Sequence, residues 1–505
     1  MKRACGVLLH ITSLPSPYGI GTLGKAAEAF VDTLRDCGQT FWQVLPLNPV
    51  GYGNSPYQSY SAFAGEPLLI DLDDLVANGL LTKAKCDAAD YGADPTFVDF
   101  EKVVKTKMPL LKEAFAAFTS SSTGGALDVA YLAFCKEESA WLDDYALFMA
   151  LKEQNGGVSW IDWGDARLRN RDGAALNEAF GNLTEQINFW KFTQFFFYRQ
   201  WSQLRRYANK NGVKLVGDIP IYASFDSADV WTNRRLFQLD GAGNPTKVAG
   251  VPPDYFSETG QLWGNPLYDW GAMKSDGYTW WIKRVRKSAE LYDTVRIDHF
   301  RAFDTYYAIP YGEKTAVKGE WLNGPGMDLF NTIRDAKIGD NSGEYPFIIA
   351  EDLGELFDSV KVLLRDTGFP GMKILQFGFN GDNADNEHLP HNYNNNMVVY
   401  TGTHDNSTIN GYLKSAVRAT NAMAKSYAAP NWFEKIHMAC IRSLYASSAG
   451  LVVIPMQDII GLDDKARMNI PGKVLPSNWV WRMQRGEFKP SMAKQLRRLA
   501  TTYFR

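Results

Sequence analysis

Three carboxylates in this sequence each follow a short apolar run. Asp298 closes D-T-V-R-I-D, Glu351 follows F-I-I-A, and Asp405 follows M-V-V-Y-T-G-T-H. Such runs, bounded by turn residues, are typical of parallel strands buried on both faces, and packing explains a polar group at their carboxyl ends poorly. Parallel barrels place their catalytic residues at those strand ends. The three carboxylates therefore predict a barrel enzyme that acts on glycosidic bonds.

The neighbours of two of these carboxylates indicate different chemical roles. Arg296 and Asp298 lie two residues apart, so on a strand both side chains point to one face. The guanidinium favours an ionised Asp298, which suits a nucleophile that attacks an anomeric carbon, whereas a structural Arg–Asp pair is the alternative. Glu351 follows three apolar residues. Burial beside other carboxylates would raise its pKa and keep it protonated as the general acid.

The third carboxylate, Asp405, directly follows His404 in G-T-H-D-N. We expect it to bind ring hydroxyls, to favour a distorted sugar ring and to hold the Glu351 proton through its negative charge. The alternative is a plain turn with a capping aspartate, because Asp and Asn favour turns.

Eight apolar runs are predicted to be the strands that position these groups, and helical patterns separate several of them. Together they predict one catalytic (β/α)8 TIM barrel over residues 1–505, with long insertions. A helix is expected over 23–37, a C-terminal helix is expected around Leu496, and 68–71 resembles a further short strand. The eight predicted strands are 5–10, 41–46, 213–218, 293–298, 347–351, 372–378, 397–402 and 450–455.

Two long segments interrupt the predicted barrel. Residues 72–190 are rich in Ala, Lys and Glu with helical periodicity, which predicts a helical insertion. Residues 222–290 are rich in Pro, Gly, Trp and Tyr and are too long for an ordinary connection, so we expect a loop-rich insertion that covers the active site. Within it, V-P-P-D-Y-F-S-E at 251–258 has the composition of a lid over the site, or of an ordered surface loop anchored by Phe256.

The composition is that of a soluble globular protein with an uncharged substrate. Hydrophobic residues make up 45% of the 505 residues, the net charge is −3, and no basic block indicates a nucleic-acid or membrane partner. The five cysteines are odd in number and form no C-x-x-C pair, which favours a reducing compartment over a disulfide framework or zinc site. His10 interrupts the N-terminal apolar run, so a signal peptide is not expected.

Several longer motifs resemble a known family. The set G-D-I-P-I-Y (217–222), V-R-I-D-H-F-R (295–301), I-I-A-E-D-L-G (348–354) and T-G-T-H-D-N (401–406) resembles the four barrel motifs of the α-amylase clan. The stretches at 6–21, 42–65 and 250–270 are more specific, and they resemble 4-α-glucanotransferases of the amylomaltase, or disproportionating enzyme, family. The resemblance runs from Gly6 to beyond Asn469.

The resemblance implies a role for each matching residue. Asp298 would be the nucleophile, Glu351 the acid/base and Asp405 the stabiliser of the transition state, with no metal or organic cofactor. The partners would be α-1,4-glucans such as maltooligosaccharides, starch and glycogen, with glucose as an acceptor. The residues implied in substrate binding are Arg296, His404, Asp218, Asp352, Asn469, Tyr52, Tyr57, Ser55, Trp263, Asp254, Tyr255 and Phe256.

These expectations combine into a retaining double displacement that moves a glucan segment to another sugar. Retention predicts that the carboxyl groups of Asp298 and Glu351 lie about 5–5.5 Å apart. An α-amylase-like hydrolase on the same barrel is the alternative enzyme, and a glucan-binding protein on an inactive barrel is the alternative of another class. The bacterial cytoplasm fits best, although a plastid protein without its transit peptide would look the same.

Overall fold

The computed structural model describes residues 1–120, 124–253, 257–339, 343–354, 356–381 and 383–505. Asp254, Tyr255 and Phe256, which the sequence analysis places in substrate binding and in the lid, lie outside the described residues, as does the side chain of Tyr52.

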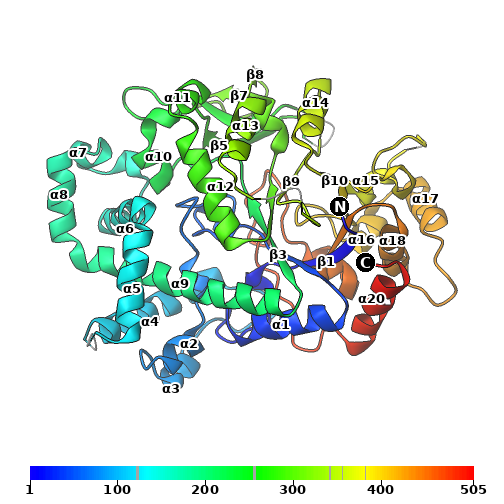
Figure 1. Ribbon diagram of the computed structural model, residues 1–505, viewed down its shortest axis with the longest axis horizontal. Coiled ribbons are helices and arrows are strands. Elements are labelled where there is room, and N and C mark those ends of the chain that lie inside the picture. Colours follow the sequence, from blue (N-terminus) through cyan, green and yellow to red (C-terminus); the bar gives the residue numbers. More distant parts are fainter. Residues whose placement is uncertain (121–123, 254–256, 340–342, 355, 382) are drawn as a thin grey trace.

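The core of the molecule is an eight-stranded parallel sheet (Figure 1). The strand order is β10-β11-β12-β1-β2-β3-β6-β9, and the backbone N–H of Ala350 donates to the carbonyl of Pro370 (2.9 Å), which joins the two ends of the sheet. All eight predicted strands are present, and the TIM-barrel fold is confirmed, but the second half of the strand predicted over 372–378 is the short helix α15 (Leu375–Gly378). The strands are β1 (Ala4–Leu8), β2 (Phe41–Gln43), β3 (Lys214–Ile219), β6 (Thr294–Ile297), β9 (Ile348–Ala350), β10 (Gly371–Ile374), β11 (Met397–Tyr400) and β12 (Leu451–Pro455).

The strands are short and apolar because both of their faces are covered. Every residue of β1, β6, β9, β10 and β12 is buried. Amphipathic helices cover the outer face, each with one buried stripe, such as Phe30, Val31 and Leu34 of the first helix. They include α1 (Lys25–Asp36), α12 (Thr279–Leu291), α13 (Met327–Asp335), α14 (Asp358–Thr367), α18 (Ile436–Ala446) and α20 (Pro490–Thr502). The predicted helices near both chain ends are therefore confirmed.

A group of helices lies between β2 and β3, on the left of Figure 1. Phenylalanines hold part of this group together, since Phe192 of α9 contacts Phe115 and Phe118 of α4 (ring centroids 5.5 and 5.4 Å apart). The helices are α2 (Leu72–Ala77), α3 (Lys83–Ala88), α4 (Phe100–Ser120), α5 (Ala126–Glu137), α6 (Ser139–Gln154), α7 (Ala166–Arg169), α8 (Gly173–Asn182) and α9 (Thr184–Lys210). None of the helices in the described ranges is long and apolar enough to span a membrane.

The strand predicted over 68–71 is wrong. This segment starts with a 3-10 helix, η3 (Pro67–Leu69), because Pro67 fits the first helical position and the Glu66 carboxylate accepts a hydrogen bond from the N–H of Leu68 (2.9 Å).

A second, antiparallel sheet was not anticipated from the sequence. Its order is β5-β4-β7-β8, formed by β5 (Gln261–Pro266), β4 (Lys247–Val251), β7 (Thr305–Pro310) and β8 (Glu320–Asn323). It has its own small core around Val248, Tyr307 and Ile309. Two of its strands, with α10 (Ala228–Thr232) and α11 (Trp270–Ser275), fall within the segment 222–290, so much of that segment is regular structure.

Candidate active site

The carboxyl ends of three neighbouring barrel strands, β3, β6 and β9, bring predicted polar residues together. Asp218 lies near the end of β3 and is paired in register with Arg296 of β6. Asp298 follows β6 directly, Glu351 follows β9, and β6 and β9 are neighbours with Ile297 opposite Ala350. The register of the sheet therefore places Asp298 and Glu351 side by side at one end of the barrel.

Arg296 joins two aspartates through the two arms of its guanidinium. Its Nη1 donates to Oδ2 of Asp218 and its Nη2 donates to Oδ1 of Asp298, both at 2.7 Å. The hydroxyl of Tyr57 donates to the same Asp218 oxygen (2.7 Å). The Asp218 side chain is fully buried, whereas the Asp298 side chain keeps 28% of its surface exposed. The structural pair is thus Arg296 with Asp218, and Asp298 is the carboxylate that remains accessible to a substrate.

Electrostatics in this cluster follow from burial and from its single cation. Burial raises the pKa of Asp218 to about 7, and the charge of Asp298 adds to that rise, while Arg296 and the hydroxyl of Tyr57 oppose it. Burial also works against the charge on Arg296, but Asp218 and Asp298 outweigh it and hold the guanidinium pKa well above its ordinary value. The guanidinium is therefore protonated at neutral pH.

Glu351 is held by backbone groups. The N–H of His299 donates to its Oε2 (2.7 Å) and the N–H of Leu353 donates to its Oε1 (2.8 Å). Burial raises the pKa of Glu351 to about 7; the charge of Asp298 adds to this rise and Arg296 opposes it. A carboxyl group with such a pKa carries a proton in a large fraction of molecules near neutral pH, which is the requirement for a general acid.

Asp405 is positioned by a segment that lies far from it in the sequence. The Asn469 side-chain N–H donates to Oδ1 of Asp405 (2.7 Å), and Arg467 donates to the Asp405 carbonyl (2.5 Å). Asn406, and not Asp405, caps the local turn, since Oδ1 of Asn406 accepts from the N–H of Thr403 (2.8 Å). The Asp405 side chain, 39% exposed, therefore does not serve as the capping group of the turn.

An aromatic wall formed by Tyr57, His404 and Trp479 borders the cluster. The rings of Tyr57 and His404 stack with centroids 5.2 Å apart, and the Trp479 ring lies 5.7 Å from the first and 5.8 Å from the second. His404 Nε2 lies 3.3 Å from Oδ1 of Asp405. Burial lowers the pKa of His404, although Asp405 opposes this, so the ring is neutral at neutral pH.

A second pair of rings is formed by Trp263 and His299. Their centroids are 4.9 Å apart and the rings are perpendicular. His299 directly follows Asp298, adopts a left-handed backbone conformation (φ 51°) and donates its N–H to Glu351, so it links Asp298 and Glu351 to Trp263. Burial lowers its pKa to about 3, with a further contribution from Arg301.

His299, Arg467 and Trp479 were not predicted as site residues. Two of them had a local signal, because His299 immediately follows the predicted nucleophile and Arg467 lies two residues before the predicted Asn469. Arg467 and Trp479 reach the site only through the folding of a distant segment.

Two predicted residues have other partners. Asp352 is buried, with its Oδ1 accepting from the N–H of Met372 (2.5 Å) and its Oδ2 accepting from Nζ of Lys373 (3.1 Å). It therefore links the end of β9 to β10 and takes no part in the hydrogen bonds of the cluster. Ser55 accepts a hydrogen bond from the N–H of Tyr57 (3.3 Å), which helps to place that ring.

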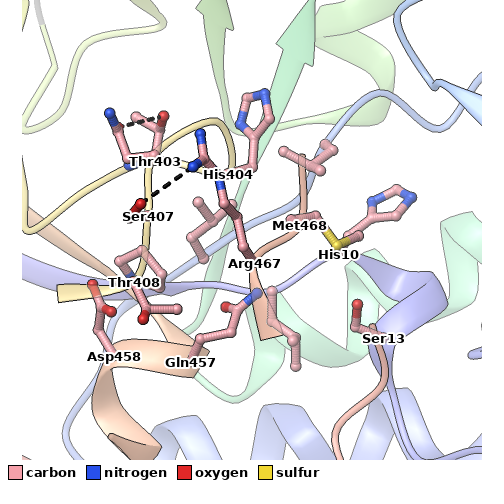
Figure 2. A pocket seen from close by; sticks show the side chains of 15 residues that line it. His10, Ser13, Thr403, His404, Ser407, Thr408, Gln457, Asp458, Arg467 and Met468 are labelled. Atoms are coloured by element: carbon pink, nitrogen blue, oxygen red, sulfur yellow. Dashed lines mark hydrogen bonds between the residues drawn. The ribbon is translucent and has the colours of Figure 1, made fainter. Parts of the chain in front are cut away.

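A small cavity lies behind the 403–408 turn (Figure 2). His404 and Arg467 line it on one side and His10 on another, and none of the three carboxylates borders it. The ends of β1 and β12 close it, through Leu8 and Pro455. This cavity belongs to the support of the aromatic wall and is not a substrate cleft.

The fold and the cluster together define a class. A parallel (β/α)8 barrel with two adjacent carboxylates at strand ends, one beside a guanidinium and one with a raised pKa, is a barrel enzyme of glycosidic-bond chemistry.

Comparison with known proteins identifies the family. A family model described as 4-alpha-glucanotransferase matches residues 9–488. The chain is 46% identical to a 4-alpha-glucanotransferase of Thermus thermophilus over 509 residues (99% of this chain, 98% of the relative) and 44% identical to one of Clostridium butyricum over 500 residues (98% and 100%). An amylomaltase from Streptococcus agalactiae, solved in complex with acarbose, superposes with a TM-score of 0.96 and 41% identity, covering 100% of both chains. The chain belongs to the 4-alpha-glucanotransferase family, which confirms the predicted enzyme class.

Proposed function

We propose that the protein disproportionates α-1,4-glucans by a retaining mechanism. It moves a segment of a donor maltooligosaccharide or starch chain to the 4-hydroxyl of an acceptor glucan or of glucose. The observation that carries this proposal is the contrast between two adjacent carboxyl groups. Asp298 is bound to the Arg296 guanidinium, whereas Glu351 is buried with a pKa of about 7. Two carboxyl groups in such different environments suit the nucleophile and the acid of one reaction.

In the first step, an Asp298 oxygen attacks the anomeric carbon and the bond from that carbon to the glycosidic oxygen breaks. Glu351 gives its proton to the departing oxygen, which leaves a covalent glucosyl ester on Asp298 and frees the reducing-end fragment. In the second step, Glu351 takes a proton from the acceptor 4-hydroxyl as that oxygen attacks the same carbon and releases Asp298. The predicted separation of about 5–5.5 Å between the two carboxyl groups belongs to this mechanism.

The other polar groups are assigned to the donor sugar. Asp405, with Asn469 and the neutral His404 beside it, offers oxygen and nitrogen atoms to ring hydroxyls. The aromatic wall provides an apolar surface for a sugar face. Asp218 acts through Arg296, because it fixes the guanidinium that orients Asp298.

The acceptor is assigned to the side of Trp263 and His299. These rings border Asp298 and Glu351 through the bond that His299 makes to Glu351. An acceptor sugar stacked there would occupy the place of water, and transfer requires that a sugar be favoured over abundant water. Tyr255 and Phe256, which lie outside the described residues, remain predicted parts of the same acceptor side.

Incubation of the purified protein with maltotriose alone tests the proposal. Disproportionation yields glucose and a ladder of longer maltooligosaccharides while the number of reducing ends stays constant. Glucose and maltose with a rising number of reducing ends would instead identify a hydrolase. No product at all would leave only a glucan-binding protein.

We infer a cytoplasmic location from the cysteines. All five stand as free thiols, with Cys5, Cys37, Cys86 and Cys440 buried. Thiols persist in this form in a reducing compartment.

A further inference from the structure

Two neighbouring aromatic side chains stand almost entirely in solvent. Trp432 is 95% exposed and Phe433 is 94% exposed. Large aromatic residues usually bury most of their surface, and single exposed ones need no explanation, but two adjacent ones present a contiguous apolar patch. Within the described ranges, neither ring packs against another ring. The pair, which we call the Trp-Phe tip, is therefore available for a ligand.

The Trp-Phe tip is held by a firm support. It lies between α17 (Arg418–Ala428) and α18, at the end of the molecule opposite α7 and α8 (Figure 1). Arg442 of α18 donates to the carboxylate of Glu434 (2.8 Å) and to the carbonyls of Ala428 (2.9 Å) and Ala429 (3.0 Å). The Arg442 guanidinium thus links the segments on both sides of the tip. The backbone that carries the two rings therefore loses little conformational freedom on binding.

The tip lies at the catalytic end of the barrel. The last turn of α18 is at the opposite end, because the carbonyl of Ser447 accepts hydrogen bonds from Arg3, which precedes β1, and from Arg505 (2.8 and 2.9 Å). The beginning of α18, and the tip just before it, must therefore lie at the carboxyl ends of the strands. The segment from α16 (Ile409–Ser415) through the tip also starts only four residues after Asp405. The catalytic carboxylates and the tip face the same end of the molecule.

We propose that the Trp-Phe tip is a second docking site for α-glucan chains, separate from the active site, that holds long or granular glucan at the catalytic end. This inference rests on the proposed function, since it takes the ligand to be the enzyme's own polymeric substrate. Aromatic rings suit the uncharged, partly apolar faces of glucose units. A polymer held at the tip raises the local concentration of chain ends near the carboxylates without a new contact in the active site.

The size and charge of the tip disfavour two other occupants. Two large aromatic side chains supply roughly 300–500 Å² of surface, well below the about 800 Å² per partner that stable protein interfaces bury. Membrane surfaces bind clusters of about four to eight Lys and Arg. The tip has one acid and one base following it, Glu434 and Lys435, and the acid is already bound to Arg442. An uncharged polysaccharide fits this surface better than a second protein or an anionic bilayer.

Replacement of both rings by alanine tests the proposal, with Phe504→Ala as the matched control. Phe504 is 85% exposed and lies two residues after α20, so its replacement removes an exposed aromatic ring that is not part of the tip. For the Trp432→Ala/Phe433→Ala variant we expect kcat/KM on maltotriose within about twofold of the parent. We expect binding to insoluble starch granules to weaken about five- to tenfold, and KM for amylose to rise by a similar factor. The control should match the parent in all three measurements.

The outcomes separate this inference from the proposed function. If the parent makes a ladder from maltotriose but its granule binding is absent, or is the same in the double variant, the docking site is overturned while the function stands. Loss of a dimer in sedimentation velocity would identify a self-association surface, and loss of binding to vesicles of phosphatidylglycerol would identify a membrane contact. Either result would also overturn the proposal. A parent without any maltotriose ladder would refute the function itself.

Discussion

Two parts of the active site are built in different ways. The strand-end cluster of Asp218, Arg296, Asp298 and Glu351 is held by barrel strands and by charge-assisted hydrogen bonds of 2.7 Å. The rings around it are carried by segments outside the barrel strands: Tyr57 before η3, Trp263 on β5 of the antiparallel sheet, and Trp479 near the C-terminus. Of these three rings, Tyr57 is the one with a hydrogen bond to the cluster, at Asp218.

From this difference we infer that the strand-end cluster positions the reacting groups and that the rings select the substrate. A nucleophile and an acid must be held within a few tenths of an ångström, and strands at the core of a barrel provide that rigidity. Rings carried outside the barrel strands can adapt to donor and acceptor sugars and can exclude water. We therefore expect substitutions in the strand-end cluster to abolish chemistry and substitutions of the rings to change which substrate reacts.

The Asp298→Asn variant should show the largest effect. The amide is almost isosteric but cannot form the glucosyl ester, so glucose release from maltotriose should fall about 10⁴-fold or more. Maltotriose binding, followed by tryptophan fluorescence, should persist because Arg296 keeps its bond to Asp218. Activity above a tenth of the parent value would assign the nucleophile elsewhere.

The acid role of Glu351 predicts a specific pH dependence. Because the general acid must be protonated, kcat/KM of the parent should decrease as the pH rises through about 7. Glu351→Gln should lower turnover of maltotriose by about 10²- to 10⁴-fold and remove this alkaline limb. A donor whose leaving group needs no proton, such as α-glucosyl fluoride, should form the covalent intermediate at a nearly normal rate. An unchanged alkaline limb in the variant would exclude Glu351 as the titrating group.

The sequence was sufficient for the strands and for the cluster because both have local signals. Most of the buried strands are short and largely apolar, and Asp298 and Glu351 each directly follow one. Alternation along the chain also explains why Asp352 differs from Glu351: neighbouring side chains point to different sides, and Asp352 points to Met372 and Lys373 of β10. The position of Asp352 beside Glu351 in the motif did not reveal these partners, and its contact with glucan stays a prediction.

What the sequence did not predict depends on distant segments. Arg467 and Trp479 are 62 and 75 residues from the residues that they support, Asp405 and His404, and even the predicted Asn469, two residues after Arg467, does not reveal which residue Arg467 contacts. The antiparallel sheet was missed because K-V-A-G-V of β4 is short and contains glycine, and because its partner β7, which in turn pairs with β8, comes after β6. Such pairings are properties of the tertiary fold, and a single sequence carries little local trace of them.

Tyr57→Phe tests the hydrogen bond between the Tyr57 ring and the strand-end cluster. Loss of the hydroxyl removes a hydrogen bond to Asp218 but keeps the ring on His404, so we expect kcat/KM on maltotriose to fall about tenfold, as for one hydrogen bond to a charged group. Tyr18→Phe is a matched control, because it removes a similar Tyr–Asp hydrogen bond, to Asp73 (2.6 Å), that joins no residue of the cluster. Equal losses in both variants would mean that the Tyr57 bond serves stability only.

Trp263→Ala should have the smallest effect on rate and a clear effect on selectivity. The indole borders His299, which bonds to Glu351 through its backbone, so the variant leaves the strand-end cluster intact while it opens the acceptor side to water. We expect the ratio of hydrolysis to transfer to rise roughly three- to tenfold, with total donor cleavage reduced less than that. The ratio is measured as new reducing ends against total glucose released from maltotriose, and Trp432→Ala, a tryptophan outside the active site, should leave it unchanged. If the ratio stays constant while cleavage falls sharply, Trp263 supports the strand-end cluster itself. The inference that the cluster positions the reacting groups while the rings select the substrate would then fail on this side of the site.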